Sequence, residues 1–277
     1  MSVDVALGAI VASTALVIAL MLLARRFAPR GGHFADTNRA TGVYGIVGAG
    51  FAILLGFVVL LAFQRYWEAK SKASEEATAV FQQYQVAALF RPERKRNRLW
   101  GELACYARAV VEDEWPAMES GRRSRLVDLW VERMEAEVPA AEITTRSEET
   151  AYQQWFENAG KRDAARRERL LEADGSLPAL LWIVLILAAV SVVAFTLLFA
   201  DREERLLGQA ISAGSVAAVV VSSLLAVVLL ASPFGGGHGR VAPSSMRYTL
   251  ETIEAEAVLL HDPQAAPCDA RGRPRRV

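Results

Sequence analysis

ATGVYGIVGAGFAILLGFVVLLAFQ, residues 40–64, contains no charged side chain, and this stretch decides the fold of the chain. At a rise of about 1.5 Å per residue it is long enough to cross a hydrocarbon core about 30 Å thick as a helix. The next stretch, RYWEAKSKASEEATAVFQQYQVAALF (65–90), is polar and charged but has neither Gly nor Pro, so nothing stops the helix at the membrane surface. Together they predict a membrane span that continues as a stalk.

Three further uncharged runs are also long enough to span a membrane. We expect four transmembrane helices, at about residues 5–24, 42–64, 177–200 and 208–231. The connections within each pair are short, so each pair forms an antiparallel hairpin. The expected divisions are a first hairpin (1–64), a helical soluble domain between the second and third spans (65–174), a second hairpin (175–232), and a polar tail with a short helix at about 244–260 (233–277).

The inserted domain has helical periodicity throughout. Leu99, Leu103, Tyr106 and Val110 lie four, three and four residues apart, which places them on one face of a helix that we expect to end at Trp115-Pro116. No window alternates apolar and polar residues long enough to predict a strand. The sequence therefore predicts an all-α protein.

The predicted stalk has a seam of small side chains, including Ala69, Ala73 and Ala77. Such a seam suits close helix packing. It fits either the face of a bundle within one subunit or a contact around an oligomer axis, and the sequence leaves both open.

The charge distribution and the absence of catalytic motifs argue against several classes of function. Lys plus Arg and Asp plus Glu both number 31 and are interleaved, so there is no broad basic face to attract nucleic acid. The four spans contain no charged residue, which argues against a proton relay or an ion-coupled transporter. No GxSxG, HExxH or GxxxxGK[ST] motif is present, so we expect neither an enzyme nor a cofactor or metal site.

Two acidic groups and two cysteines could suggest metal or redox chemistry. Glu112-Asp113-Glu114 and the pair Glu75-Glu76 could bind a divalent cation, but we prefer solvated helical faces. Cys105 and Cys268 lack metal-ligand spacing, so we expect a buried thiol and an unconstrained thiol.

Small residues at four-residue spacing mark two of the spans. They let helix backbones approach closely, either within one subunit or between subunits. The candidates for helix packing are Gly48, Ala52, Gly56, Gly214, Ala218 and Ser222.

Four segments resemble the bestrophin-like (DUF4239) family of bacterial membrane proteins. They are LLGFVVLLAFQRYWEA (54–69), EEATAV (75–80), YARAVVEDEWPAM (106–118) and SPFGG (232–236). The resemblance implies kinship with bestrophins, which are pentameric anion channels with four spans per subunit and a helical cytosolic domain between the second and third. It implies a homo-oligomer in the lipid bilayer of the bacterial cytoplasmic membrane, with small anions as the permeant species.

In bestrophins, apolar side chains of the second span form a narrow pore neck. The row Ile53, Phe57 and Leu61 could form such a constriction here, where a dry apolar ring resists water and ions. The alternative hypothesis is a non-conducting sensor or scaffold whose helical domain binds a partner.

The positive charges give conflicting indications of the membrane orientation. The short connections contain Arg25, Arg26, Arg30, Arg39, Arg202 and Arg205, which favours an external helical domain. The flanks of that domain contain Arg65, Lys70, Lys72, Lys161, Arg162, Arg166, Arg167 and Arg169. With the bestrophin resemblance, these flanks lead us to expect a cytoplasmic domain.

Overall fold

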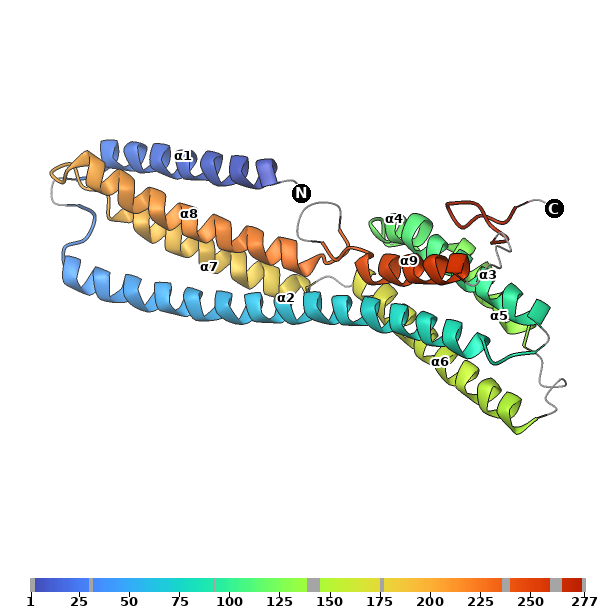
Figure 1. Cartoon of the computed structure of the whole chain (residues 1–277). Coiled ribbons are helices and arrows are strands. Elements are labelled where there is room, and N and C mark those ends of the chain that lie inside the picture. The colour runs from blue at the N-terminus through green and yellow to red at the C-terminus, as the bar shows by residue number, and fades with distance from the viewer. Residues whose placement is uncertain are drawn as a thin grey trace. The chain divides into compact units, whose positions relative to one another are not determined.

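The computed structural model describes residues 3–29, 32–91, 93–138, 145–174, 177–235, 240–259 and 266–275. Within these ranges every extended regular element is a helix, and a single isolated bridge joins Cys268 and Pro274, so the all-α prediction is confirmed. The elements are α1 (Val3–Phe27), α2 (Thr37–Ala87), α3 (Glu93–Ala109), the π-helical turn η1 (Val110–Glu114), α4 (Trp115–Met118), α5 (Arg125–Ala136), α6 (Arg146–Asp174), α7 (Ala179–Leu198), α8 (Leu206–Ala231) and α9 (Ser244–Leu259) (Figure 1).

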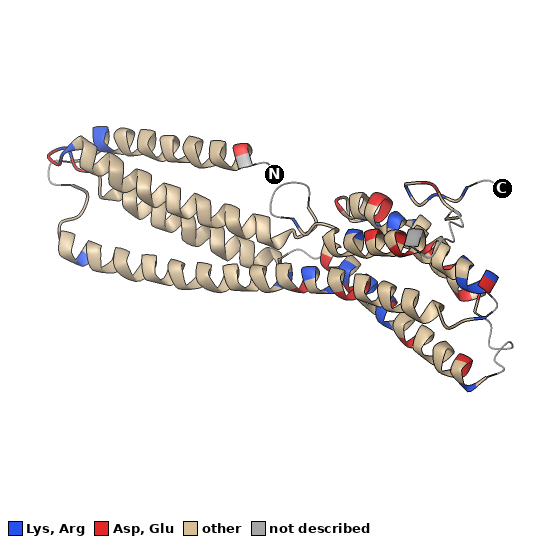
Figure 2. Cartoon of the chain, in the orientation of Figure 1, with Lys and Arg blue, Asp and Glu red and all other residues tan. Residues whose placement is uncertain are grey.

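Four of these helices are long and apolar enough to cross a membrane, namely α1, α2, α7 and α8. The predicted four spans are thereby confirmed. Figure 2 shows few charged residues along α1, α7, α8 and the first part of α2. This distribution is expected because a charge inside the hydrocarbon costs several kcal/mol.

The chain forms two compact units. The membrane unit comprises Met1–Arg65, Ser176–Ser232 and Gly236–Arg240, and the helical unit comprises Tyr66–Gly175, Pro233–Gly235 and Val241–Val277. The helix α2 contributes to both units and runs without a break from Thr37 to Ala87, so the predicted continuation of the second span into a stalk is confirmed.

In the membrane unit, an apolar cluster joins α2, α7 and α8. Its buried members include Phe51 and Val58 of α2, Leu185 of α7 and Val227 of α8. Because lipid tails are as apolar as these side chains, the cluster stabilises the unit mainly through close packing.

Two arginines join α1 to the connection between α7 and α8. The Arg25 Nη2 donates hydrogen bonds to the carbonyl oxygens of Arg202 at 2.8 Å and Glu204 at 2.7 Å, and the Arg202 Nε donates to the Arg25 carbonyl at 3.1 Å. The Arg25 carbonyl lies in the last turn of α1, where carbonyl groups have no partner within the helix. The Ala28 backbone N–H donates to this carbonyl at 3.3 Å, and Arg202 supplies a second donor.

The alanine seam of the stalk lies inside the helical unit. Ala69, Ala73 and Ala77 are buried in its core, and the Thr249 hydroxyl of α9 donates to the Ala77 carbonyl at 3.3 Å. Of the two alternatives for this seam, the structure shows the first, in which the seam is one face of a helix bundle within a single subunit.

Trp115-Pro116 does not end the helix as expected. The chain passes from α3 through η1 directly into α4, with Pro116 in the first turn of α4. A proline is tolerated there because the first backbone N–H groups of a helix need no intrahelical partner. The π-helical turn also leaves Glu112 exposed and buries Glu114.

The expectation for the two cysteines is wrong, because Cys105 and Cys268 form a disulfide. Their Cα atoms are 5.8 Å apart although 163 residues separate them in sequence. The bond holds the segment 266–275 against α3, and an added Cβ at Gly272, which has φ +74°, would lie 2.6 Å from the Ala109 nitrogen. The pairing escaped prediction because it depends on tertiary contact and leaves no signal in the spacing.

Candidate functional site

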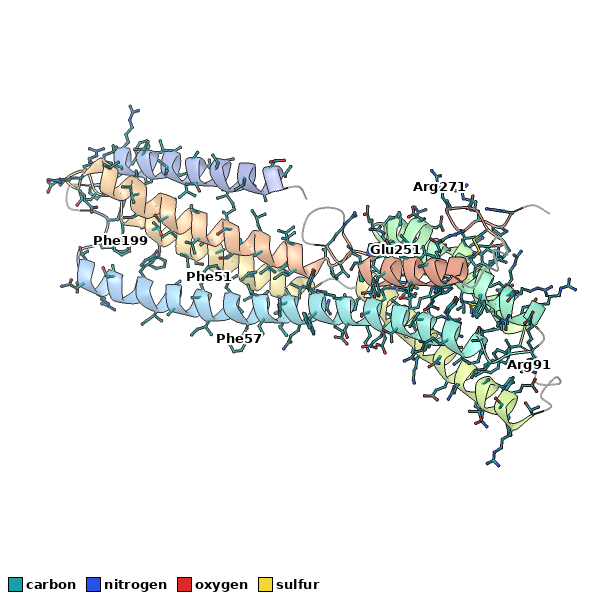
Figure 3. All side chains as sticks on the ribbon, in the orientation of Figure 1. Phe51, Phe57, Arg91, Phe199, Glu251 and Arg271 are labelled. Atoms are coloured by element: carbon teal, nitrogen blue, oxygen red, sulfur yellow. A yellow bond between two sulfur atoms is a disulfide. The ribbon has the colours of Figure 1, made fainter. Side chains whose placement is uncertain are left out.

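The membrane part of α2 has an inward and an outward face. Phe51 and Val58 are buried against α7 and α8, whereas Phe57 points away from both helices (Figure 3). Residues 51 and 58 are seven positions apart, close to two helical turns, so they share one face. The chain therefore buries one side of this span and leaves the opposite side uncovered.

The predicted constriction residues all lie on the uncovered side. Ile53 and Phe57 are each 63% exposed, and Leu61 is 45% exposed. Their spacing of four places the three side chains on one stripe of the helix. This row is therefore open to lipid, to a second copy of the chain or to an axis between copies.

The small-residue ridge of α2, formed by Gly48, Ala52 and Gly56, is also uncovered within the subunit. An added Cβ at Gly48 or Gly56 would meet no atom within 4 Å, and Ala52 is exposed. Residue 52 lies about 100° around the helix from both residue 51 and residue 53, so the ridge occupies the flank between the buried face and the apolar row. Among the described residues of one chain, no helix packs closely on this ridge.

The small residues of α8 lie in three different environments. An added Cβ at Gly214 would lie 3.2 Å from Ile18 Cδ1, so Gly214 permits a close approach of α1. Ala218 is half-buried, and Ser222 is exposed with its hydroxyl donating to the Val219 carbonyl at 3.1 Å. Of these three residues, Gly214 has the clearest packing role inside the subunit.

A cavity with both polar and apolar walls lies in the membrane unit beside the connections of the two hairpins. Its volume is about 530 Å³, and its lining includes His33, Tyr44, Thr196, Asp201 and Gln209. The Tyr44 and Thr196 hydroxyl oxygens are 3.1 Å apart, and Gln209 Nε2 donates to the Asp201 carbonyl at 3.0 Å. Sequence reasoning missed this cavity because its walls come from segments far apart in the chain.

The helical unit contains a buried network of ion pairs. Arg169 Nε lies 2.6 Å from Glu76 Oε2, and Arg169 Nη2 lies 2.6 Å from Glu114 Oε2. Arg166 also pairs with Glu114 at 2.6 Å, and the Tyr106 hydroxyl donates to Glu76 Oε1 at 2.8 Å. The network connects α2, α3, η1 and α6.

The prediction that the two acidic groups lie on solvated helical faces is wrong for Glu76 and Glu114, because both are fully buried. Burial alone would raise the pKa of Glu114, but Arg169 and Arg166 outweigh it and hold that pKa below its ordinary value. Each of these two carboxylates forms an ion pair with at least one arginine. Among the described residues, no group of three or more His, Cys, Asp or Glu side chains could hold a metal ion.

A sequence signal for this network exists in α6. Arg162, Arg166 and Arg169 continue the spacing of the apolar residues Trp155 and Ala159 on one helical face. Arginines that extend a buried stripe require buried acceptors. Their partners could not be identified from sequence, because Glu76 and Glu114 lie 93 and 55 residues from Arg169.

Comparisons with known proteins agree with this architecture. The model of the Bestrophin-like domain matches residues 11–246. A mutant of a bacterial Bestrophin homolog from Klebsiella pneumoniae has a TM-score of 0.69 at 13% identity, covering 90% of this chain and 98% of that chain. A second mutant of the Klebsiella pneumoniae homolog has a TM-score of 0.65 at 13% identity, covering 89% and 98%. No match was found among curated protein sequences.

Proposed function

Because this chain belongs to the bestrophin-like family, we propose that several copies assemble in the bacterial cytoplasmic membrane and conduct small anions along an axis lined by α2. The observation that carries the proposal is the outward apolar row Ile53, Phe57 and Leu61, which the rest of the described chain leaves largely exposed. The family resemblance implies a pentamer. The proposed activity is conduction and includes no catalytic step.

An apolar ring can act as a gate without any charged group. When several copies present Phe57 to a common axis, the ring is narrow and poorly wetted, and an ion must shed water to pass. Shortening the side chain widens the ring and lowers this barrier. Ile53 and Leu61 extend the dry zone by about one helical turn in each direction.

Chloride flux into liposomes tests the proposal. Purified wild-type protein should raise the flux above that of empty liposomes, and Phe57→Ala should raise it several-fold further. The matched control is Leu187→Ala on α7, another outward-facing apolar residue, which should leave the flux unchanged. Flux no greater than that of empty liposomes would contradict conduction, and flux carried by cations alone would contradict the anion assignment.

A second candidate is a non-conducting sensor or scaffold. Its specific support is that α2 passes unbroken from the membrane unit into the buried ion-pair network through Glu76. A partner bound to the helical unit could then bias α2 directly. Native mass spectrometry separates the two candidates, because a ring supports the channel and a monomer or dimer supports the sensor.

A further inference from the structure

The disulfide is a structural part of the helical unit. Cys105 and Cys268 are both fully buried, and the Trp130 indole nitrogen donates to the Gly272 carbonyl at 2.8 Å within the segment that the bond holds. Disulfides persist in oxidising compartments and are rare in the reducing cytosol. A buried disulfide surrounded by such contacts indicates that this unit folds in an oxidising compartment.

The short connections supply an independent observation. Arg25 and Arg26 end α1, Arg39 lies in the first turn of α2, and Arg202 and Arg205 lie between α7 and α8. Arginines in short connections favour the cytoplasmic side. Since each span crosses the membrane once, a cytoplasmic position for both connections requires the helical unit to lie on the other side.

The positive charges at both ends of the helical unit favour a cytoplasmic domain, but several of them are engaged in contacts within the unit. Arg162, Arg166 and Arg169 are buried, and the last two are paired with Glu114. Lys72 pairs with Glu168 at 2.8 Å. These four side chains are held in contacts within the unit, whereas the flanking Lys70, Lys161 and Arg167 remain exposed. Because the inserted unit is longer than about 60 residues, only its ends, within about 15–20 residues of the spans, count in the charge rule, and the disulfide decides between the two charge signals.

We infer that the helical unit lies on the oxidising, extracytoplasmic side of the membrane and that the two hairpin connections lie in the cytoplasm. This inference replaces the expectation of a cytoplasmic domain. It holds whether or not the chain conducts. Any ligand or partner of the helical unit must therefore be present outside the cytoplasm.

Labelling of single introduced thiols tests the orientation. Ala136→Cys at the end of α5 and Ala35→Cys between α1 and α2 are matched substitutions at exposed positions, one on each expected side. Since the native cysteines form a disulfide, each variant has one free thiol and the wild type serves as the blank. A membrane-impermeant maleimide is added to intact spheroplasts and, in parallel, to permeabilised ones.

We expect Ala136→Cys to react in intact spheroplasts and Ala35→Cys to react only after permeabilisation. The reverse pattern, or equal reaction of both variants in intact spheroplasts, would overturn the inference. Labelling of denatured, unreduced wild-type protein would also overturn it, because the disulfide would then be absent. Size-exclusion chromatography of each variant confirms that it retains the fold.

Discussion

The Arg169 guanidinium lies 2.6 Å from the Glu76 carboxylate, measured from Nε to Oε2, and both side chains are fully buried. A charge pair in such a place is costly to desolvate, so its main effect appears when one partner is removed. The pair joins α6 to the part of α2 that belongs to the helical unit.

We expect Arg169→Met to lower the free energy of unfolding by about 3–5 kcal/mol, because Glu76 loses its buried cation and Glu114 loses one of two. Thermal unfolding of the detergent-solubilised protein measures the change. The control is Arg167→Met, an exposed position on the same helix, which should behave like the wild type. Equal midpoints for the two variants would contradict a stabilising role of the pair.

Glu102 makes stability depend on pH. Burial, followed by the nearby Glu137, raises the pKa of Glu102 from 4.5 to about 7. The folded chain therefore binds this proton more tightly than the unfolded chain, and stability is lost as the pH rises between these two values. We expect the wild-type Tm to fall more than that of Glu102→Gln between about pH 5 and pH 8.

The control for this measurement is Glu93→Gln, at an exposed carboxylate of α3. Its Tm should follow the wild type across the pH range. Parallel curves for the wild type and Glu102→Gln would show that Glu102 has an ordinary pKa.

Removing the disulfide should destabilise the helical unit. A bond that closes a long loop stabilises a protein by roughly 2–5 kcal/mol, so Cys105→Ser/Cys268→Ser should unfold at a lower temperature. Limited trypsin digestion should also cleave the segment after Arg271 and Arg275 faster in the variant. Two alkylatable thiols in unreduced, denatured wild-type protein would contradict the bond itself.

Gly214 and Gly56 test the two small-residue ridges. Gly214→Leu should destabilise the chain by about 1–3 kcal/mol, because the new side chain collides with Ile18 of α1. An added Cβ at Gly56 meets no neighbour within the subunit, so Gly56→Leu should leave the thermal stability of the monomer unchanged. Native mass spectrometry shows whether Gly56→Leu still forms oligomers, and loss of oligomers would assign the α2 ridge to a contact between subunits.

Features that depend on neighbouring residues in the sequence were predictable, whereas features that depend on contacts between distant residues were not. The continuous helix α2 was predictable because its uncharged run and the absence of Gly and Pro in the stalk are local features. The Cys105–Cys268 bond and the burial of Glu114 were not, because each depends on residues brought together by the tertiary fold. The outward position of Phe57 required the structure to identify which face of α2 contacts α7 and α8.

The disulfide also closes a covalent ring. The chain between Cys105 and Cys268 includes α5, α6, both helices of the second hairpin and α9. With the helical unit outside the cytoplasm, this ring can close only after α7 and α8 have been made and Cys268 has crossed the membrane to meet Cys105 of α3. Formation of the bond would therefore be a late step in biogenesis, and the oxidised protein would be one whose second hairpin already crosses the bilayer.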